Sequence, residues 1–166
     1  AGEHGVRHAI SFHHTIAKAQ KFQIQQDILN LDANLGPEMI NLHVSSKKTV
    51  QQRADILDEF PSHPASLLTN ARCLTEGVNI PEVDCVLFAD PKQSVVDIVQ
   101  AAGRAMRLHD GKQYGYIILP ILIPDGMELE EFAETTEFRN VARTITALTT
   151  QDSRIAEEFR LLASGT

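Results

Sequence analysis

Short apolar segments alternate with longer amphipathic segments along most of this chain, and this order constrains its fold more than any other feature. Strands that alternate with amphipathic helices are typical of a parallel β-sheet with crossover helices. The predicted strands are 8–12, 39–44, 65–69, 83–88 and 115–119, and the predicted helices are about 15–31, 49–60 and 94–106. The sequence therefore predicts an α/β fold, with a mostly parallel sheet and helices on both of its faces.

Composition places the chain among packed globular domains. It has 166 residues, of which 43% are hydrophobic and 22% are charged. This length suits one domain, and the apolar content is too high for an intrinsically disordered chain. The two cysteines, Cys73 and Cys85, are too few for a disulfide framework. We therefore expect inert, buried thiols and a reduced, cytoplasmic setting.

Net charge limits how the chain can bind a polyanion. Fifteen Lys and Arg residues stand against 22 Asp and Glu residues, which gives a net charge of −7. Domains that bind nucleic acid by bulk electrostatic attraction are usually basic. Any contact with nucleic acid is therefore expected from a few placed cations and from backbone amides. The seven histidines form no cluster with the spacing of a zinc site, so we predict no metal centre.

The pattern changes after Pro124. Apolar residues then recur at roughly helical spacing, without the short runs that predict strands. We therefore predict a sheet domain over residues 1–124 and a helical extension over residues 125–166, which packs on this domain or on a neighbouring one. The residues that carry this pattern are Phe132, Phe138, Val141, Ile145, Leu148, Ile155, Phe159 and Leu162.

The segment 69–81 is the first of two that can carry chemistry. It follows a predicted strand at the sheet edge where doubly wound folds bind their ligands. Gly77 can supply a positive φ or allow close approach to a ligand, and Asn79 can hydrogen-bond a sugar hydroxyl. The alternative interpretation is a purely structural turn.

The segment 100–107 is the second. Arg104 and Arg107 are three residues apart, so a helix places both guanidinium groups on one face near its end. Ala101, Ala102 and Gly103 are small and would let another surface approach. Two guanidinium groups in this arrangement suit phosphate oxygens. The alternative is a pair of solvated arginines that only favour the helix dipole.

Taken together, the two segments resemble a known family. "TNARCLTEGVNIPEVDCVLFADP" followed by "QAAGRAMR" resembles motifs V and VI of superfamily 2 helicases, and "HAISFHHTIAKAQ" resembles motif IV. The resemblance covers the second RecA-like domain of the motor, from about residue 8 to residue 120. The matching positions are Gln100, Gly103, Arg104 and Arg107 for Q-x-x-G-R-x-x-R, and Thr69, Gly77, Val78 and Asn79 for motif V.

This resemblance implies a RecA-like fold and a role for each matching residue. It implies that Arg104 and Arg107 are arginine fingers, which face the γ-phosphate of ATP held by the first RecA-like domain. The residues implied to lie beside the nucleotide or to couple the domains are Gln100, Gly103, Gly77 and Asn79. Those implied to hold backbone phosphates of nucleic acid are Thr69, Ser45 and His13, the last two mainly through nearby backbone amides.

Some positions depart from the DEAD-box form of the family. Asn70, Glu76 and Asn79 stand where that form has Asp, Arg and Asp, and Gln100 stands in place of its His. These differences favour the group that contains restriction-enzyme motor subunits and related DNA helicases, and thus DNA over RNA. The chain also lacks the G-x-x-x-x-G-K-[ST] loop. ATP and Mg²⁺ are therefore expected to be held mainly by the first RecA-like domain of the parent chain, and the isolated fragment is expected to be inactive.

Two alternatives to a helicase motor stay open at this point. One is a motor that translocates on duplex DNA inside a restriction complex without unwinding it. The other is a non-catalytic α/β binding module that kept the motor fold and lost its coupling to ATP.

Overall fold

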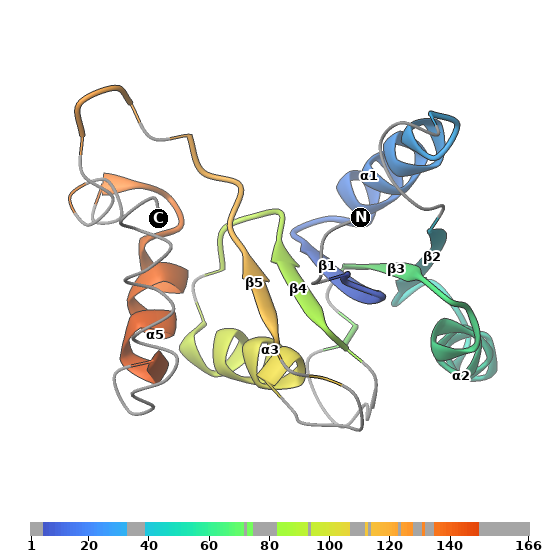
Figure 1. Cartoon of the computed structure of the whole chain (residues 1–166). Helices are drawn as coiled ribbons and strands as arrows, with labels where there is room; N and C mark the ends of the chain where they lie inside the picture. Colours follow the sequence, from blue (N-terminus) through green and yellow to red (C-terminus); the bar gives the residue numbers. More distant parts are fainter. Residues whose placement is uncertain are drawn as a thin grey trace.

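A five-stranded, all-parallel sheet forms the centre of the molecule, with strand order β2-β3-β1-β4-β5 (Figure 1). The computed structural model describes residues 5–32, 39–71, 73–74, 83–92, 94–106, 112, 114–122, 124–127, 131 and 135–149. The strands are β1 (His8–His13), β2 (Ile40–Ser45), β3 (Ser66–Ala71), β4 (Cys85–Phe88) and β5 (Tyr116–Ile118). The predicted parallel sheet is confirmed, and the bounds of the strands differ from the predicted ones by at most two residues.

Helices cover both faces of the sheet, as predicted. Helix α1 lies on one side of the sheet, and α2 and α3 lie on the other (Figure 1). The helices are α1 (Ile16–Leu29), α2 (Val50–Glu59), α3 (Val95–Met106) and α5 (Arg139–Thr149), and a short 3-10 turn, η2 (Phe60–Ser62), follows α2. None of the described helices is long and apolar enough to cross a membrane.

Local sequence explains where these helices begin. Thr15 caps α1, since its hydroxyl accepts a hydrogen bond from the Lys18 backbone N–H at 3.2 Å. Thr49 caps α2 within a capping box, in which the Gln52 side chain accepts from the Thr49 backbone N–H at 3.0 Å. Each cap satisfies backbone donors that a helix leaves free at its start.

The face of the sheet that α2 and α3 cover is apolar. One row of side chains runs across all five strands on this face, because the register pairs its members directly. The row consists of Leu42, Leu68, Ile10, Val86 and Ile117. Helix α3 completes this core with a buried stripe at i, i+3, i+4 and i+7, formed by Ile98, Ala101, Ala102 and Ala105.

The stripe on α3 corrects one prediction. Ala101 and Ala102 do not present a small surface to an approaching partner, because both are buried against the sheet. Their small side chains instead let α3 pack closely on the strands. Gly103 is the member of the predicted small-residue segment that stays partly exposed.

The opposite face of the sheet is polar beneath α1. His43, Thr69 and Ser11 form the row that follows in register on this face. The hydroxyl of Thr69 donates to the Leu42 carbonyl at 3.1 Å and accepts from His43 Nδ1, 2.9 Å away. Beside this row, Phe22 of α1 packs against a small apolar cluster formed by Ala9, Leu67 and Cys85, and Ala19 is the one residue of α1 that is fully buried.

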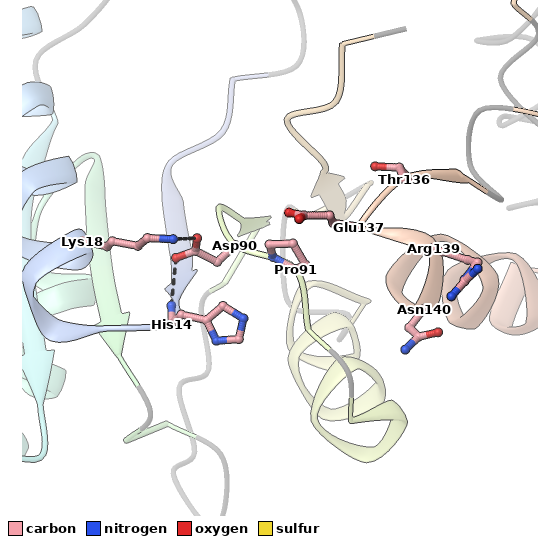
Figure 2. A pocket seen from close by; sticks show the side chains of 8 residues that line it. All are labelled: His14, Lys18, Asp90, Pro91, Thr136, Glu137, Arg139 and Asn140. Carbon is pink, nitrogen blue, oxygen red and sulfur yellow. Dashed lines mark hydrogen bonds and ion pairs between the residues drawn. The ribbon is translucent and has the colours of Figure 1, made fainter.

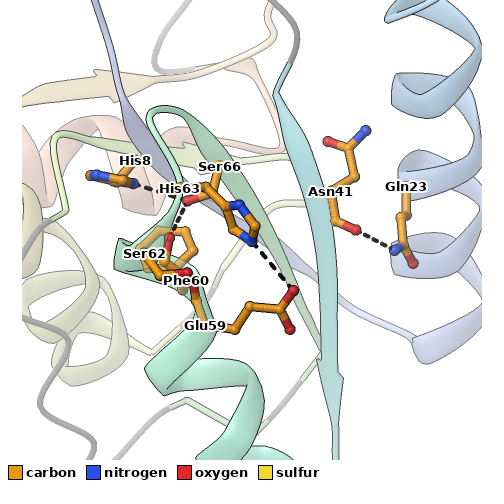
Figure 3. A network of polar contacts seen from close by, with 8 residues as sticks. All are labelled: His8, Gln23, Asn41, Glu59, Phe60, Ser62, His63 and Ser66. Carbon is orange, nitrogen blue, oxygen red and sulfur yellow. Dashed lines mark hydrogen bonds and ion pairs between the residues drawn. The ribbon is translucent and has the colours of Figure 1, made fainter.

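A second polar network ties the end of α2 to the start of the sheet (Figure 3). The Ser66 hydroxyl donates to the Phe60 carbonyl at 2.7 Å and accepts from His8 Nδ1, 2.9 Å away. The His8 ring also lies against the Phe60 ring, with 5.4 Å between the centroids. Phe60, fully buried, thereby fixes the 3-10 turn over the amino end of β1 and β3.

Helix α5 packs on α3 and joins the main core. Its residues Val141 and Ile145 are buried in the same apolar cluster as the α3 stripe, and Phe138 packs against that cluster. Residues 150–166, where the sequence predicts a further helical segment, lie outside the described residues. The division of the chain at residue 124 stays a prediction.

The approach of β5 to the end of α3 generates a test of this packing. A Cβ added at Gly115 would overlap the carbonyl oxygen of Ala105, so Gly115→Ala must push β5 away from α3. We expect the free energy of unfolding to fall by about 1–3 kcal/mol, as for other overpacked sites. Gly103→Ala is the control, because a Cβ there meets no atom within 4 Å. It should raise stability by about 0.5–1 kcal/mol. Urea unfolding of the 166-residue chain measures both; equal effects would contradict the proposed contact.

Candidate functional site

Three adjacent strands end together at the carboxyl edge of the sheet. His13 at the end of β1 and Ser45 at the end of β2 both pair in register with Ala71 at the end of β3. Two of the three predicted nucleic-acid residues therefore lie on this edge, on either side of β3. Their side chains are buried: the His13 ring bonds Ser11 Oγ at 3.0 Å and lies against Phe22. The structure therefore does not present these two side chains to a ligand at this edge.

Thr69 differs from its prediction. Its side chain is 0% exposed, and its hydroxyl is engaged by the Leu42 carbonyl and by His43 beneath α1. The structure therefore does not present this hydroxyl to a phosphate at the surface. The reason is positional: Thr69 stands two residues before the end of β3, with its side chain on the face that α1 covers.

Asn70 shapes the exit from β3. Its Oδ1 accepts a hydrogen bond from the Cys73 backbone N–H and another from the Cys73 thiol, both at 3.2 Å. Asp offers the same acceptor at such a turn. The Asn at this position thus preserves the turn in spite of the departure from the DEAD-box pattern.

Burial favours the neutral form of two histidines near this edge and of both cysteines. Burial lowers the pKa of His13, as do His43 and Lys18, while Asp90 opposes the shift. Burial also lowers the pKa of His43. Burial raises the pKa of Cys85 to about 12 and raises that of Cys73. The predicted interpretation of both cysteines as inert thiols fits these shifts.

A pocket of about 340 Å³ opens at the carboxyl edge beside β1 and β4 (Figure 2). Chain connections leave these two strands in opposite directions, which is where doubly wound sheets bind ligands. The pocket is lined by His14, Lys18, Asp90, Pro91, Thr136, Glu137, Arg139 and Asn140. Its charges are mixed, so it does not concentrate positive potential. Among the described residues, no group of three or more His, Cys, Asp or Glu side chains is placed to hold a metal ion.

Asp90 organises the floor of this pocket. It accepts a hydrogen bond from the His14 backbone N–H at 2.9 Å and forms an ion pair with Lys18 (Figure 2). Burial raises the pKa of Asp90, but the bonds from Lys18 and His14 outweigh burial and leave the pKa below its ordinary value of 3.8. Asp90 therefore stays ionised and ties the start of α1 to the end of β4.

The outer face of α3 carries part of the second predicted site. Gln100 is exposed, and open space lies above Gly103, where an added Cβ would meet no atom within 4 Å. Val96 lies on the same side of the helix, since it precedes Gln100 by four residues and Gly103 by seven, and it is 63% exposed. This face has room for a partner domain or a nucleotide, which agrees with the roles predicted for Gln100 and Gly103.

Arg104 points inward. It is 9% exposed, and its Nη2 donates to the Leu74 carbonyl at 2.9 Å. The guanidinium thus links α3 to Leu74, so this structure does not present it at the surface as the predicted arginine finger. Arg107, Gly77 and Asn79 lie outside the described residues, so their predicted positions at the nucleotide stay predictions.

The two predicted sites lie toward opposite edges of the sheet. Helix α3 connects the parallel strands β4 and β5, so its last turn lies near the amino edge, away from His13 and Ser45. Lys112 marks this end: its Nζ donates to the Val83 carbonyl at 2.6 Å and to the Ala105 carbonyl. Sequence analysis overlooked Lys112, because a single lysine in a connecting segment has no pattern that sets it apart.

A comparison with protein families shows which family the chain belongs to. The model described as "Helicase conserved C-terminal domain" matches residues 3–109. The chain belongs to this helicase family. The curated relatives that it matches also carry helicase names, and the chain spans only about a tenth of their length. "Putative ATP-dependent helicase IRC3" of Saccharomyces cerevisiae is 33% identical over 76 residues, which are 46% of this chain and 11% of that protein. "Putative mitochondrial ATP-dependent helicase irc3" of Schizosaccharomyces pombe is 37% identical over 62 residues, 37% of this chain and 10% of that protein.

Solved structures confirm the RecA-like fold of a helicase C-terminal domain. "ATP-dependent Type ISP restriction-modification enzyme LlaBIII bound to DNA" superposes with a TM-score of 0.67 and 36% identity, and covers 84% of this chain and 10% of that one. The C-terminal domain of the DEAD-box protein Dbp5 superposes with a TM-score of 0.63 and 16% identity, and covers 94% of this chain and 82% of that one. The higher identity with the restriction enzyme agrees with the sequence-based leaning away from DEAD-box proteins.

The Lys18–Asp90 ion pair generates a pH-dependent prediction. Folding lowers the pKa of Asp90 below its ordinary value of 3.8. Its contribution to stability is therefore complete above pH 3.8 and is lost as the pH falls through the lower pKa of the folded state. We expect Asp90→Asn to lower the Tm at neutral pH, and the difference from the wild type to shrink in acid. Added salt should also reduce it, since the Lys18 side chain is 58% exposed.

Thermal unfolding of both proteins across a pH series measures this difference. Asp58→Asn, at an exposed position of α2, is the control and should leave the Tm unchanged. A difference between Asp90→Asn and the wild type that stays constant far below pH 3.8 would argue against the ion pair.

Proposed function

We propose that this chain is the second motor domain of an ATP-dependent superfamily 2 helicase, and that it completes an ATP site held mainly by a first RecA-like domain. The observation that carries the proposal is the outer face of α3, where Gln100 and Gly103 of the Q-x-x-G-R-x-x-R motif are accessible and unobstructed. A face with a glycine that the domain's own packing does not require is suited to close approach by a partner.

On the nucleotide side, ATP bound between the two domains supplies the phosphoryl group that is transferred to water. Its γ-phosphoryl oxygens gain charge as the bond breaks, and guanidinium groups delivered by this domain stabilise that charge. We assign this role to Arg107, with Gln100, Gly77 and Asn79 beside the nucleotide. Arg104, whose guanidinium is buried and bonded to the Leu74 carbonyl, positions the end of α3 in this proposal. Mg²⁺ and the phosphate-binding loop belong to the first domain in this proposal.

The apolar residues near the start of α3 support the presence of that partner domain. Val95 and Val96 are 56% and 63% exposed, and Val99 is exposed as well. They continue the line of Gln100 and Gly103 along the helix. An exposed apolar stripe beside motif residues is expected where two motor domains meet and separate during the ATP cycle.

On the opposite edge, we propose that the strand ends at His13 and Ser45 hold the phosphates of nucleic acid through backbone N–H groups. Such contacts carry no sequence information and suit a motor that must move along any sequence. They also suit a chain of net charge −7, in which placed donors replace a basic surface. DNA is favoured over RNA by the same residues that depart from the DEAD-box pattern.

A duplex-DNA translocase motor is the second candidate. It is favoured by the 36% identity with LlaBIII, a restriction-modification enzyme whose structure is bound to DNA. The two candidates share the ATP site and differ in whether strands separate, so a strand-displacement assay on the full-length protein distinguishes them.

The first prediction from this proposal concerns the isolated chain. The 166-residue chain should show no ATPase activity stimulated by nucleic acid, because the phosphate-binding loop lies outside its sequence. Steady-state ATP hydrolysis with and without single-stranded DNA measures this. Turnover by the purified chain that Arg107→Ala abolishes would contradict the need for a first domain.

The second prediction concerns the arginines in the full-length protein. Arg107→Ala should lower kcat by about 10³-fold or more while changing ATP affinity much less, since the charge that Arg107 stabilises develops in the transition state. Arg104→Ala should lower kcat as well, because it removes the bond that holds the end of α3 to the Leu74 carbonyl. Replacement by Lys should not restore turnover, because an ammonium lacks the planar fork of donors. Arg143→Ala on the exposed side of α5 is the matched control. Near-parental ATPase activity of both alanine variants at saturating nucleic acid would remove the main support for the proposal.

A further inference from the structure

The carbonyls of Leu74 and Val83, which flank residues 75–82, both accept hydrogen bonds from cationic side chains, one in the last turn of α3 and one six residues after its end. The Leu74 carbonyl accepts from Arg104 Nη2 at 2.9 Å, and the Val83 carbonyl accepts from Lys112 Nζ at 2.6 Å. Leu74 and Val83 are themselves buried in the main core. Both ends of the segment are therefore fixed to the same turn of the same helix.

Lys112 makes the second of these links directly. Besides Val83, its ammonium donates to the carbonyl of Ala105 in the last turn of α3. That carbonyl is one of the four that a helix leaves without an internal partner at its end. A lysine has three donors, enough to serve both oxygens at once. Burial lowers the pKa of Lys112, while the charge of Asp84 opposes this shift.

The packing around this contact leaves little freedom. Gly115 at the entry to β5 lies so near the Ala105 carbonyl that a Cβ would overlap it. The Ala105 carbonyl is thus enclosed between Lys112 and the backbone at Gly115. A polar contact in such a tight setting fixes the position of the helix end more firmly than a solvated one.

We propose that Lys112 is a positioning residue that, together with Arg104, couples Leu74 and Val83 to the end of α3. The inference rests on the proposed function, because it joins the nucleic-acid edge to the nucleotide side of that motor. Lys112 lies beyond residue 109, where the match to the helicase family model ends. Its contacts alone point to this role.

The coupling follows the chain. β3 ends at Ala71 on the proposed nucleic-acid edge, and Leu74 follows three residues later under α3. A displacement of the end of β3 is passed to α3 through the bond between Leu74 and Arg104. The bond between Lys112 and Val83 adds a second link, so the helix end shifts together with Val83 as well as with Leu74. Without Lys112, Val83 can move while the helix end stays in place.

The test compares Lys112→Met with Lys92→Met in the full-length protein. Met keeps most of the aliphatic stem and removes both donors. Lys92 is the matched control, because its Nζ lies 3.2 Å from Asp97 Oδ2 in the first turn of α3 and its side chain is 18% exposed. Both variants lose a largely buried amine that contacts α3, at opposite ends of the helix.

The measurement is steady-state ATPase activity with and without saturating single-stranded DNA, with DNA affinity and thermal unfolding recorded for each protein. We expect Lys112→Met to lower the stimulation by DNA by about 2- to 30-fold, with unstimulated turnover and DNA affinity retained. Lys92→Met should keep the parental stimulation. If Lys112→Met does not fold, Lys112→Gln keeps one amide donor and should show a smaller loss of stimulation.

Parental stimulation in Lys112→Met, or in Lys112→Gln where that variant replaces it, would overturn the positioning role. An equal loss in Lys92→Met would overturn it as well, because the effect would then reflect stability alone. Absence of DNA-stimulated ATPase activity in the parent protein is a different outcome, which overturns the proposed motor function itself.

Discussion

The parallel direction of all five strands determines where each functional segment of this domain can lie. Every strand ends at the same edge, so the segments after β1, β2 and β3 are brought together although they are far apart in sequence. Helix α3 must then run back across the sheet before β5 begins, which carries its last turn to the other edge. The parallel strands and their crossover helices therefore place two separate candidate sites at opposite edges of the sheet.

Much of this arrangement can be predicted from sequence, because it depends on local patterns. The alternation of apolar and amphipathic segments predicts the strands, since their side chains must fill the core on one or both faces. Thr15 and Thr49 mark helix starts, and Q-x-x-G-R-x-x-R identifies the helix end that bears the arginines. These features need no knowledge of which segments meet in space.

The features that sequence analysis missed depend on contacts between distant segments. Thr69 belongs to a motif, but its burial follows from the position of α1 over that face of the sheet. Ala101 and Ala102 are small in any context, and only the packed helix shows that they face inward. Arg104 and Lys112 reach backbone carbonyls about 30 residues away, and such contacts leave no trace in local composition.

The polar side chains of the sheet beneath α1 make the stability of the domain sensitive to pH. His13 and His43 lie beneath this helix as neutral rings, and burial lowers the pKa of each. In the unfolded chain these rings take up protons at higher pH than in the folded domain, so acidification below their ordinary pKa of 6.5 draws protons toward the opened state. Phe22 of α1 packs on the His13 ring and on the small apolar cluster of this face, so protonation of that ring acts directly at the contact of α1 with the sheet. Acid should therefore weaken the packing of α1 beside the end of β1, one of the strands proposed to hold nucleic acid.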